Sequence, residues 1–133
     1  MNGTTYPLEY NPVANSWTIL AQMPSLRIYF AVAAYQNKIY VIGGRDPYRL
    51  DLLSGLNEVY DTVTNTWSKK APMPKNESSI RANAIKGKIY VTSGEQFYRD
   101  ASTEIEVYDP NTDTWSSAAP MPNSSLRLRL HGR

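Results

Sequence analysis

Side chains that commonly perform catalysis are scarce in this chain of 133 residues. The sequence has no cysteine, which excludes disulfides, thiolate catalysis and Cys-based metal sites. Its single histidine, His131, lies near the C-terminal end, where a solvated side chain is the ordinary role. The carboxylate pairs Asp46 with Asp51 and Glu104 with Glu106 have no partner base or metal cluster around them. We therefore expect no catalytic residue, no metal and no cofactor, and a binding protein rather than an enzyme.

Charge and hydropathy narrow the range of partners. The net charge is +2, the charges are of mixed sign, and there is no basic block. This pattern favours neither a nucleic-acid nor a membrane-surface partner. No apolar run reaches the roughly 18–20 residues of a membrane span, and the first residues lack the basic and apolar regions of a signal peptide. The compartment stays open, with the cytoplasm slightly favoured over a secreted or cell-surface location.

An internal repeat determines which elements must position any binding residue. The stretch Asn57–Pro74 recurs as Glu104–Pro122, and a partial copy opens the chain around Tyr10 and Trp17. The three tryptophans lie 50 and 48 residues apart, and the Met-Pro pairs that follow them show the same two offsets. A period near fifty indicates one supersecondary unit per repeat.

Each complete repeat predicts four strands, because β-branched and aromatic runs alternate with turn residues. The first repeat predicts strands at 28–35, 38–42, 57–61 and 66–71, with a long loop over 45–56. The second predicts strands at 80–86, 88–92, 104–108 and 114–118, with a loop over 94–102. Two further short strands are expected at 5–10 and 17–22. The run 28–35 is almost continuously apolar, which predicts a strand buried on both faces.

These repeats resemble those of the kelch family. The first copy reads Ile39-Tyr40-Val41-Ile42-Gly43-Gly44, then Glu58-Val59-Tyr60-Asp61, Asn65-Thr66-Trp67 and Met73-Pro74. The second reads Ile89-Tyr90-Val91-Thr92-Ser93-Gly94, then Glu106-Val107-Tyr108-Asp109-Pro110, Asp113-Thr114-Trp115 and Met121-Pro122. The resemblance covers essentially the whole chain. One departure is Ser93, which stands where the family has the first glycine of its pair and would be strained if that backbone needs a positive φ.

The resemblance implies an all-β fold, a partial kelch-type β-propeller built from antiparallel four-stranded blades. We assign residues 1–24 to the second half of a blade, 25–74 and 75–122 to complete repeats, and 123–133 to the start of a further blade or a disordered tail. A closed ring needs about four to eight blades, and this chain would supply an open arc of about two and a half. We expect a fragment of a longer protein, with assembly of several copies as the alternative. Exposed blade faces would favour self-association.

Most of the recurring residues are expected to be structural. The periodic Tyr and Trp side chains would pack between neighbouring blades, and the glycines would serve the turns. The first strands of the blades would face the central channel. The structural set is Tyr10, Trp17, Gly43, Gly44, Tyr60, Trp67, Gly94, Tyr108 and Trp115.

The segment from Gly43 to Arg49 is the best candidate for partner binding, because loops on rigid scaffolds concentrate function. The resemblance adds that, in several kelch substrate receptors, arginines after the double glycine and at the start of the innermost strand line one pocket face. Arginine suits such a face because its planar fork binds carboxylates bidentately, and exposed tyrosines supply anchors. The alternative is that these are ordinary solvated loop residues. The candidates are Arg27, Arg45, Asp46, Tyr48, Arg81 and Tyr98, with Arg127 in the matching position of the tail.

The function implied by the resemblance is protein binding, with an acidic peptide as the expected kind of partner. The best-populated class of this architecture is the cullin-3 ubiquitin-ligase adaptor, in which the propeller recognises the substrate. The BTB domain of that class is not in this sequence, so we expect substrate capture alone. The alternative is a piece of a secreted or surface microbial propeller that binds glycan or protein. A part of a sialic-acid-epimerase-like propeller enzyme comes third.

Overall fold

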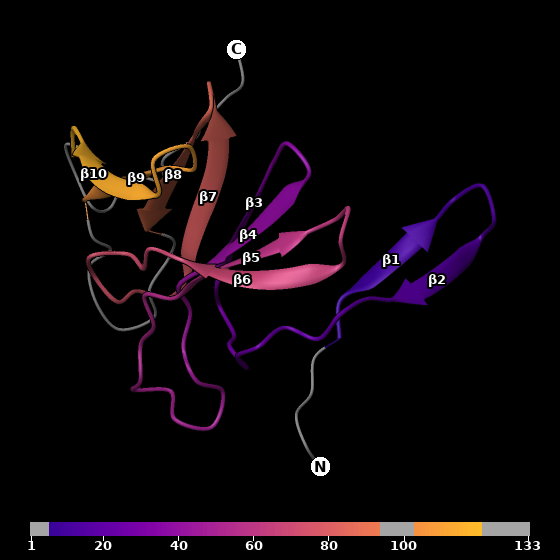
Figure 1. Cartoon of the computed structure of the whole chain (residues 1–133). Coiled ribbons are helices and arrows are strands. Elements are labelled where there is room, and N and C mark those ends of the chain that lie inside the picture. Colours follow the sequence, from indigo (N-terminus) through magenta and orange to yellow (C-terminus); the bar gives the residue numbers. More distant parts are fainter. Residues whose placement is uncertain (1–5, 94–102, 121–133) are drawn as a thin grey trace.

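A computed structural model describes residues 6–93 and 103–120, which form ten strands in three antiparallel sheets (Figure 1). Strands β1 (Leu8–Asn11) and β2 (Ser16–Ile19) make a hairpin. The first four-stranded sheet contains β3 (Ala31–Tyr35), β4 (Lys38–Ile42), β5 (Asn57–Asp61) and β6 (Thr66–Lys70). The second contains β7 (Ile80–Ile85), β8 (Lys88–Ser93), β9 (Ile105–Asp109) and β10 (Thr114–Ala118). Both sheets are meanders, since each strand pairs with the next along the chain. The described part of the chain holds no helix able to span a membrane.

The outer turns use residues that tolerate a left-handed backbone. Asn15, Asn65 and Asp113 occupy the same turn position, with φ of 50°, 54° and 54°. Asn and Asp enter this region more readily than other residues with a side chain. The residue at the start of each turn accepts backbone N–H groups of the turn through its side chain, as seen at Asn11, Asp61 and Asp109.

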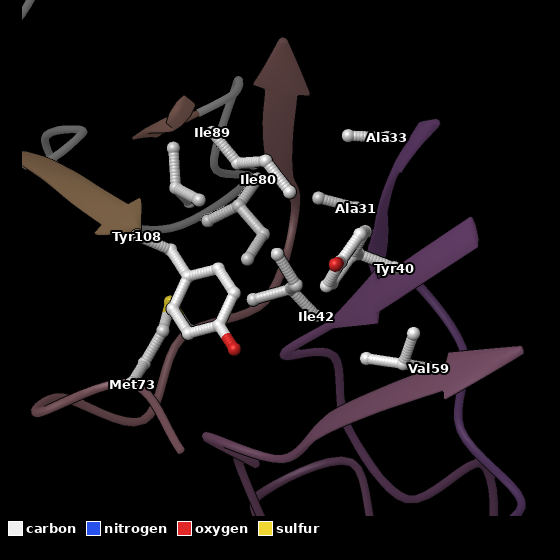
Figure 2. Packing of buried hydrophobic residues seen from close by; sticks show 10 residues of the cluster. Ala31, Ala33, Tyr40, Ile42, Val59, Met73, Ile80, Ile89 and Tyr108 are labelled. Carbon is white, nitrogen blue, oxygen red and sulfur yellow. The ribbon is translucent and has the colours of Figure 1, made fainter. Parts of the chain in front are cut away.

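The hydrophobic core lies between the two four-stranded sheets rather than within either (Figure 2). Alternate residues of a strand point to opposite faces of its sheet, and the core joins one face from each sheet. The rings of Tyr40 and Tyr108 meet across it, with centroids 5.8 Å apart. The first sheet contributes Ala31, Ala33, Tyr40, Ile42 and Val59, and the second contributes Ile80, Ile89, Val91 and Tyr108, with Met73 from the connection between the sheets.

Strand β3 differs from the sequence prediction in length and in burial. It begins at Ala31 because Ile28 forms an isolated bridge with Arg45 and Tyr29 has a φ of 56°. The prediction of burial on both faces was wrong. Ala31 faces the core, but Val32 on the opposite face is 49% exposed. Ala21, which follows the hairpin β1–β2, is bonded to Asn65 and Trp67 at the outer edge of this sheet, away from β3.

The outer strands are joined from sheet to sheet by a recurring set of hydrogen bonds that we call the outer clamp. It consists of a Trp, the Asn or Asp two residues before it, and an Ala from the preceding unit. In the first copy, Trp67 Nε1 donates to the carbonyl of Ala21 at 2.8 Å, and the Ala21 N–H donates to Asn65 Oδ1 at 2.9 Å. In the second copy the same two distances join Trp115 and Asp113 to Ala71.

A tyrosine completes each outer clamp from the neighbouring strand. The Tyr60 hydroxyl donates to Asn65 Oδ1 at 2.6 Å, and the Tyr108 hydroxyl donates to Asp113 Oδ1 at 2.6 Å. Hydrogen bonds from Tyr108 and then from the Ala71 N–H lower the pKa of Asp113, because both favour the ionised carboxylate. Each tyrosine also packs against its tryptophan, with centroids 5.2 and 5.0 Å apart. The periodic aromatic residues therefore hold neighbouring units together.

We expect Trp67→Ala to lower the free energy of unfolding by about 3 kcal/mol, because it removes a packed ring and its bond to Ala21. The matched control is Trp17→Ala, which removes a side chain that is 66% exposed and should cost less than about 1 kcal/mol. Urea denaturation at low protein concentration measures both. Equal losses in the two variants would contradict the assigned role of the outer clamp.

Candidate functional site

The long loop between β4 and β5 begins at a pair of glycines and projects below both sheets in Figure 1. Gly43 and Gly44 have φ of 69° and 104°. A Cβ atom on Gly43 would lie 2.7 Å from the carbonyl oxygen of Glu77, and one on Gly44 would lie 2.7 Å from that of Ile28. Both positions therefore require glycine. Ser93 occupies the position of Gly43 in the second repeat, where it ends β8 and pairs with Ile80.

Arg45 ties the base of the loop to the segments that lead into β3 and β7. Its Nε and Nη2 donate to the hydroxyl of the buried Ser78 at 2.8 and 2.6 Å, and its Nη1 donates to the carbonyl of Leu50 at 3.0 Å. Its backbone forms bridges with Ile28 and with Leu53. The guanidinium is thus already engaged on all three nitrogens, and it holds the loop in one conformation.

Asp46 folds the far end of the loop back on itself. Its Oδ1 accepts the backbone N–H groups of Tyr48 and Arg49 at 2.8 and 3.2 Å, the pattern of an Asx turn. The Asp46 N–H donates to the carbonyl of Leu52 at 3.1 Å, and the Leu52 N–H donates to that of Arg49 at 2.8 Å. Residues 48–53, which we call the loop tip, are therefore held by hydrogen bonds although they lie outside any strand.

The loop tip presents apolar side chains to solvent. Tyr48, Leu50, Leu52 and Leu53 are 73%, 53%, 42% and 41% exposed. Grouped exposed apolar side chains mark an interaction surface. Sequence reasoning selected Tyr48 but missed the three leucines. They could have been found from the sequence as a cluster of leucines that lacks the alternation of a strand and lies among turn residues.

Arg27 precedes β3, and its buried side chain reaches the first sheet rather than the loop tip. Its Nη2 is 2.7 Å from Glu58 Oε1, and its guanidinium also donates to the backbone carbonyls of Val41, Gly43 and Leu56. The side chains of Arg27 and Glu58 are each 3% exposed. These contacts leave Arg27 no face for a partner, so it serves as an internal brace.

The other selected residues are not brought to the loop tip by any contact that the structure shows. Arg81 is exposed on β7. Gly94, Tyr98 and Arg127 lie outside the described residues. Within residues 6–93 and 103–120, no three His, Asp or Glu side chains come together in a way that could hold a metal ion.

The second repeat has a different charge arrangement at the place of the Arg27 brace. Tyr29 and Ser79 occupy equivalent positions of the two repeats, since both have a φ of 56°. Glu58 and Glu106 are also equivalent, since they pair with Val41 and Val91. This register places Glu77 where the first repeat has Arg27, and Glu106 where it has Glu58.

Two carboxylates therefore replace the ion pair. Burial raises the pKa of Glu77 and of Glu106, and neighbouring carboxylates raise both further. Lys75 lies 3.7 Å from Glu77 Oε1 and 3.2 Å from Glu104 Oε2, and its charge offsets part of this effect. Glu106 Oε2 is buried and accepts no hydrogen bond from residues 6–93 or 103–120.

The two blades match a known protein family. The family model of the Kelch motif matches residues 26–74 and 78–122. The chain belongs to the kelch-repeat family. The family and the all-β fold class predicted from the sequence are confirmed: the two four-stranded sheets are blades of a partial β-propeller, here the β3–β6 blade and the β7–β10 blade. Kelch repeats generally mediate protein–protein interaction and are typically non-catalytic. A search of curated proteins finds no match to this chain.

The two equivalent glutamates of the kelch blades should respond oppositely to the same substitution. Glu58→Gln leaves the charge of Arg27 buried without its partner, which should cost about 3–5 kcal/mol of stability. Glu106→Gln removes a carboxylate whose pKa is raised by burial, so it should raise the free energy of unfolding at pH 7.

The pH dependence follows from the direction of the pKa shift. A carboxylate with a raised pKa binds more protons in the folded state, so its contribution to stability falls as pH rises from its unfolded pKa through its folded pKa. The gain in Glu106→Gln should therefore vanish near pH 4, where Glu106 of the parent chain is protonated. Thermal unfolding at pH 4 and pH 7 tests this. A stability loss in both variants at pH 7 would contradict the assigned charges.

Proposed function

We propose that this kelch arc captures a protein partner through its loop tip. The observation that carries the proposal is the exposure of Tyr48, Leu50, Leu52 and Leu53 on a loop whose backbone is held by Arg45 and Asp46. A loop ordered before binding loses less conformational entropy when it binds. Exposed tyrosine is among the residues that most often dominate the binding energy of an interface.

The side chains of the loop tip favour a partner segment of mixed character. The leucines and Tyr48 offer apolar contact, and the exposed Arg49 offers a guanidinium for a carboxylate. A short peptide with an apolar anchor beside an acidic residue meets both requirements. In this proposal Arg45 positions the loop, because its nitrogens already donate to Ser78 and Leu50.

Capture of a peptide fits the substrate-recognition part of a larger protein such as a cullin-3 ubiquitin-ligase adaptor. The support is the general protein-binding role of kelch repeats together with the exposed loop tip. Four of the six loop-tip side chains, Tyr48, Leu50, Leu52 and Leu53, are apolar and exposed, which favours a peptide over a glycan. We do not propose an epimerase-like role, since none of the contacts among residues 6–93 and 103–120 favours it.

The experiment compares capture by loop-tip variants. Chemical crosslinking in cell extract, followed by mass spectrometry, identifies proteins bound by the parent chain. The double variant Tyr48→Ser with Leu50→Ser should lose them, because it removes apolar contact area while the hydrogen bonds of the loop backbone remain. Binding of the purified partner should weaken at least tenfold, since burying one such apolar side chain contributes about 1.5–3 kcal/mol.

The control is Val63→Ser. Val63 is as exposed as Tyr48 but lies in the turn between β5 and β6. It should bind the partner like the parent chain. Unchanged affinity in the double variant, or the same loss in the control, would refute the loop tip as the binding surface. An increase in affinity at low salt that disappears in Arg49→Gln would identify the acidic part of the peptide.

A further inference from the structure

The hairpin β1–β2 carries a third copy of the outer clamp, and this copy faces solvent. The Tyr10 hydroxyl donates to Asn15 Oδ1 at 2.7 Å, and the rings of Tyr10 and Trp17 lie 4.9 Å apart. Asn15 has a φ of 50°, as the matching residues of the two blades do. All parts that bind an alanine backbone in the blades are therefore in position.

The surface around this exposed clamp is apolar. Leu8 pairs with Ile19 and Tyr10 pairs with Trp17, so these four side chains share one face of the hairpin. All four are exposed, and we call them the hairpin face. At the positions of Leu8 and Ile19, the β3–β6 blade has Glu58 and Lys69. A contiguous apolar face at this place indicates a docking surface.

The spacing of the repeats identifies the alanine that would fit the exposed clamp. Ala21 and Ala71 fill the two clamps inside the chain, and each lies just beyond the outer strand of its unit. Ala119 is the third alanine of this series, 48 residues after Ala71. It follows β10, is exposed, and precedes a proline as Ala71 does.

We propose that Ala119 of one copy of the chain binds the exposed clamp of a second copy, so that the chains associate head to tail. Trp17 Nε1 donates to the carbonyl of Ala119, and the Ala119 N–H donates to Asn15 Oδ1, as in the two clamps within the chain. The hairpin face of the second copy then lies beside the end of β10 in the first copy, because Ala119 directly follows that strand. Such an interface is heterologous, so it extends into chains or closed rings rather than stopping at a symmetric dimer. This association is independent of the loop tip.

Sedimentation over about 5–500 µM protein measures the association, because few contacts at each junction imply weak binding. The parent chain should form dimers and then larger species as concentration rises. Trp17→Phe keeps the ring but removes its N–H donor, and Ala119→Pro removes the backbone N–H that would donate to Asn15. Either change should shift the association to at least tenfold higher concentration. Val13→Ala, a change at the exposed turn of the same hairpin, should have no effect.

Mixing the two variants distinguishes a head-to-tail interface from any other. Trp17→Phe retains its Ala119 segment, and Ala119→Pro retains an intact clamp. An equimolar mixture should therefore form a heterodimer through the one intact junction and should not grow further. A parent chain that stays monomeric throughout, loss of association in Val13→Ala, or a mixture without heterodimer would each overturn the proposal. Circular dichroism of every variant confirms that the strands are retained.

Discussion

Each blade depends on its neighbour to cover one of its faces. A meander of four strands, each five or six residues long, has little interior of its own. Here the interior is made from Ile42 and Val59 on one sheet and Ile80 and Tyr108 on the next (Figure 2). The outer clamp adds hydrogen bonds at the periphery. Because hydrogen bonds are directional, they fix the orientation of the two sheets, which the apolar contact alone would not. The loop between β4 and β5 can be held firmly because Arg45 bonds across this same junction to Ser78.

The arrangement of strands could be predicted from the sequence because its signals are local. Turn residues such as Asn65 and Asp113, together with the repeat period, locate nearly every strand to within a few residues. Features that depend on distant partners could not be predicted. Arg27 is buried because it meets Glu58, 31 residues away, across a sheet whose register local patterns do not reveal. The exposure of the loop-tip leucines could not be predicted, because irregular segments have no period from which burial can be inferred.

The two complete repeats share a backbone but not their internal electrostatics. One has an ion pair between Arg27 and Glu58, and the other places Glu77 and Glu106 at the same positions. One turns at Gly43, and the other continues its strand through Ser93. The fold accommodates both because the apolar junction between the blades dominates the stabilisation, while polar groups near the first strands adjust to local partners.

The spacing of the outer clamps bears on how the chain reaches its folded state. Within each blade every strand pairs with the one just before it, so a blade can form from local contacts alone. The clamps span 46 and 44 residues, so closing each one costs nearly the same conformational entropy. Folding can therefore advance by one repeat at a time, with each completed blade serving as a template for the next. Lengthening the array adds further identical steps instead of a slower search, which explains how one motif serves propellers of different sizes.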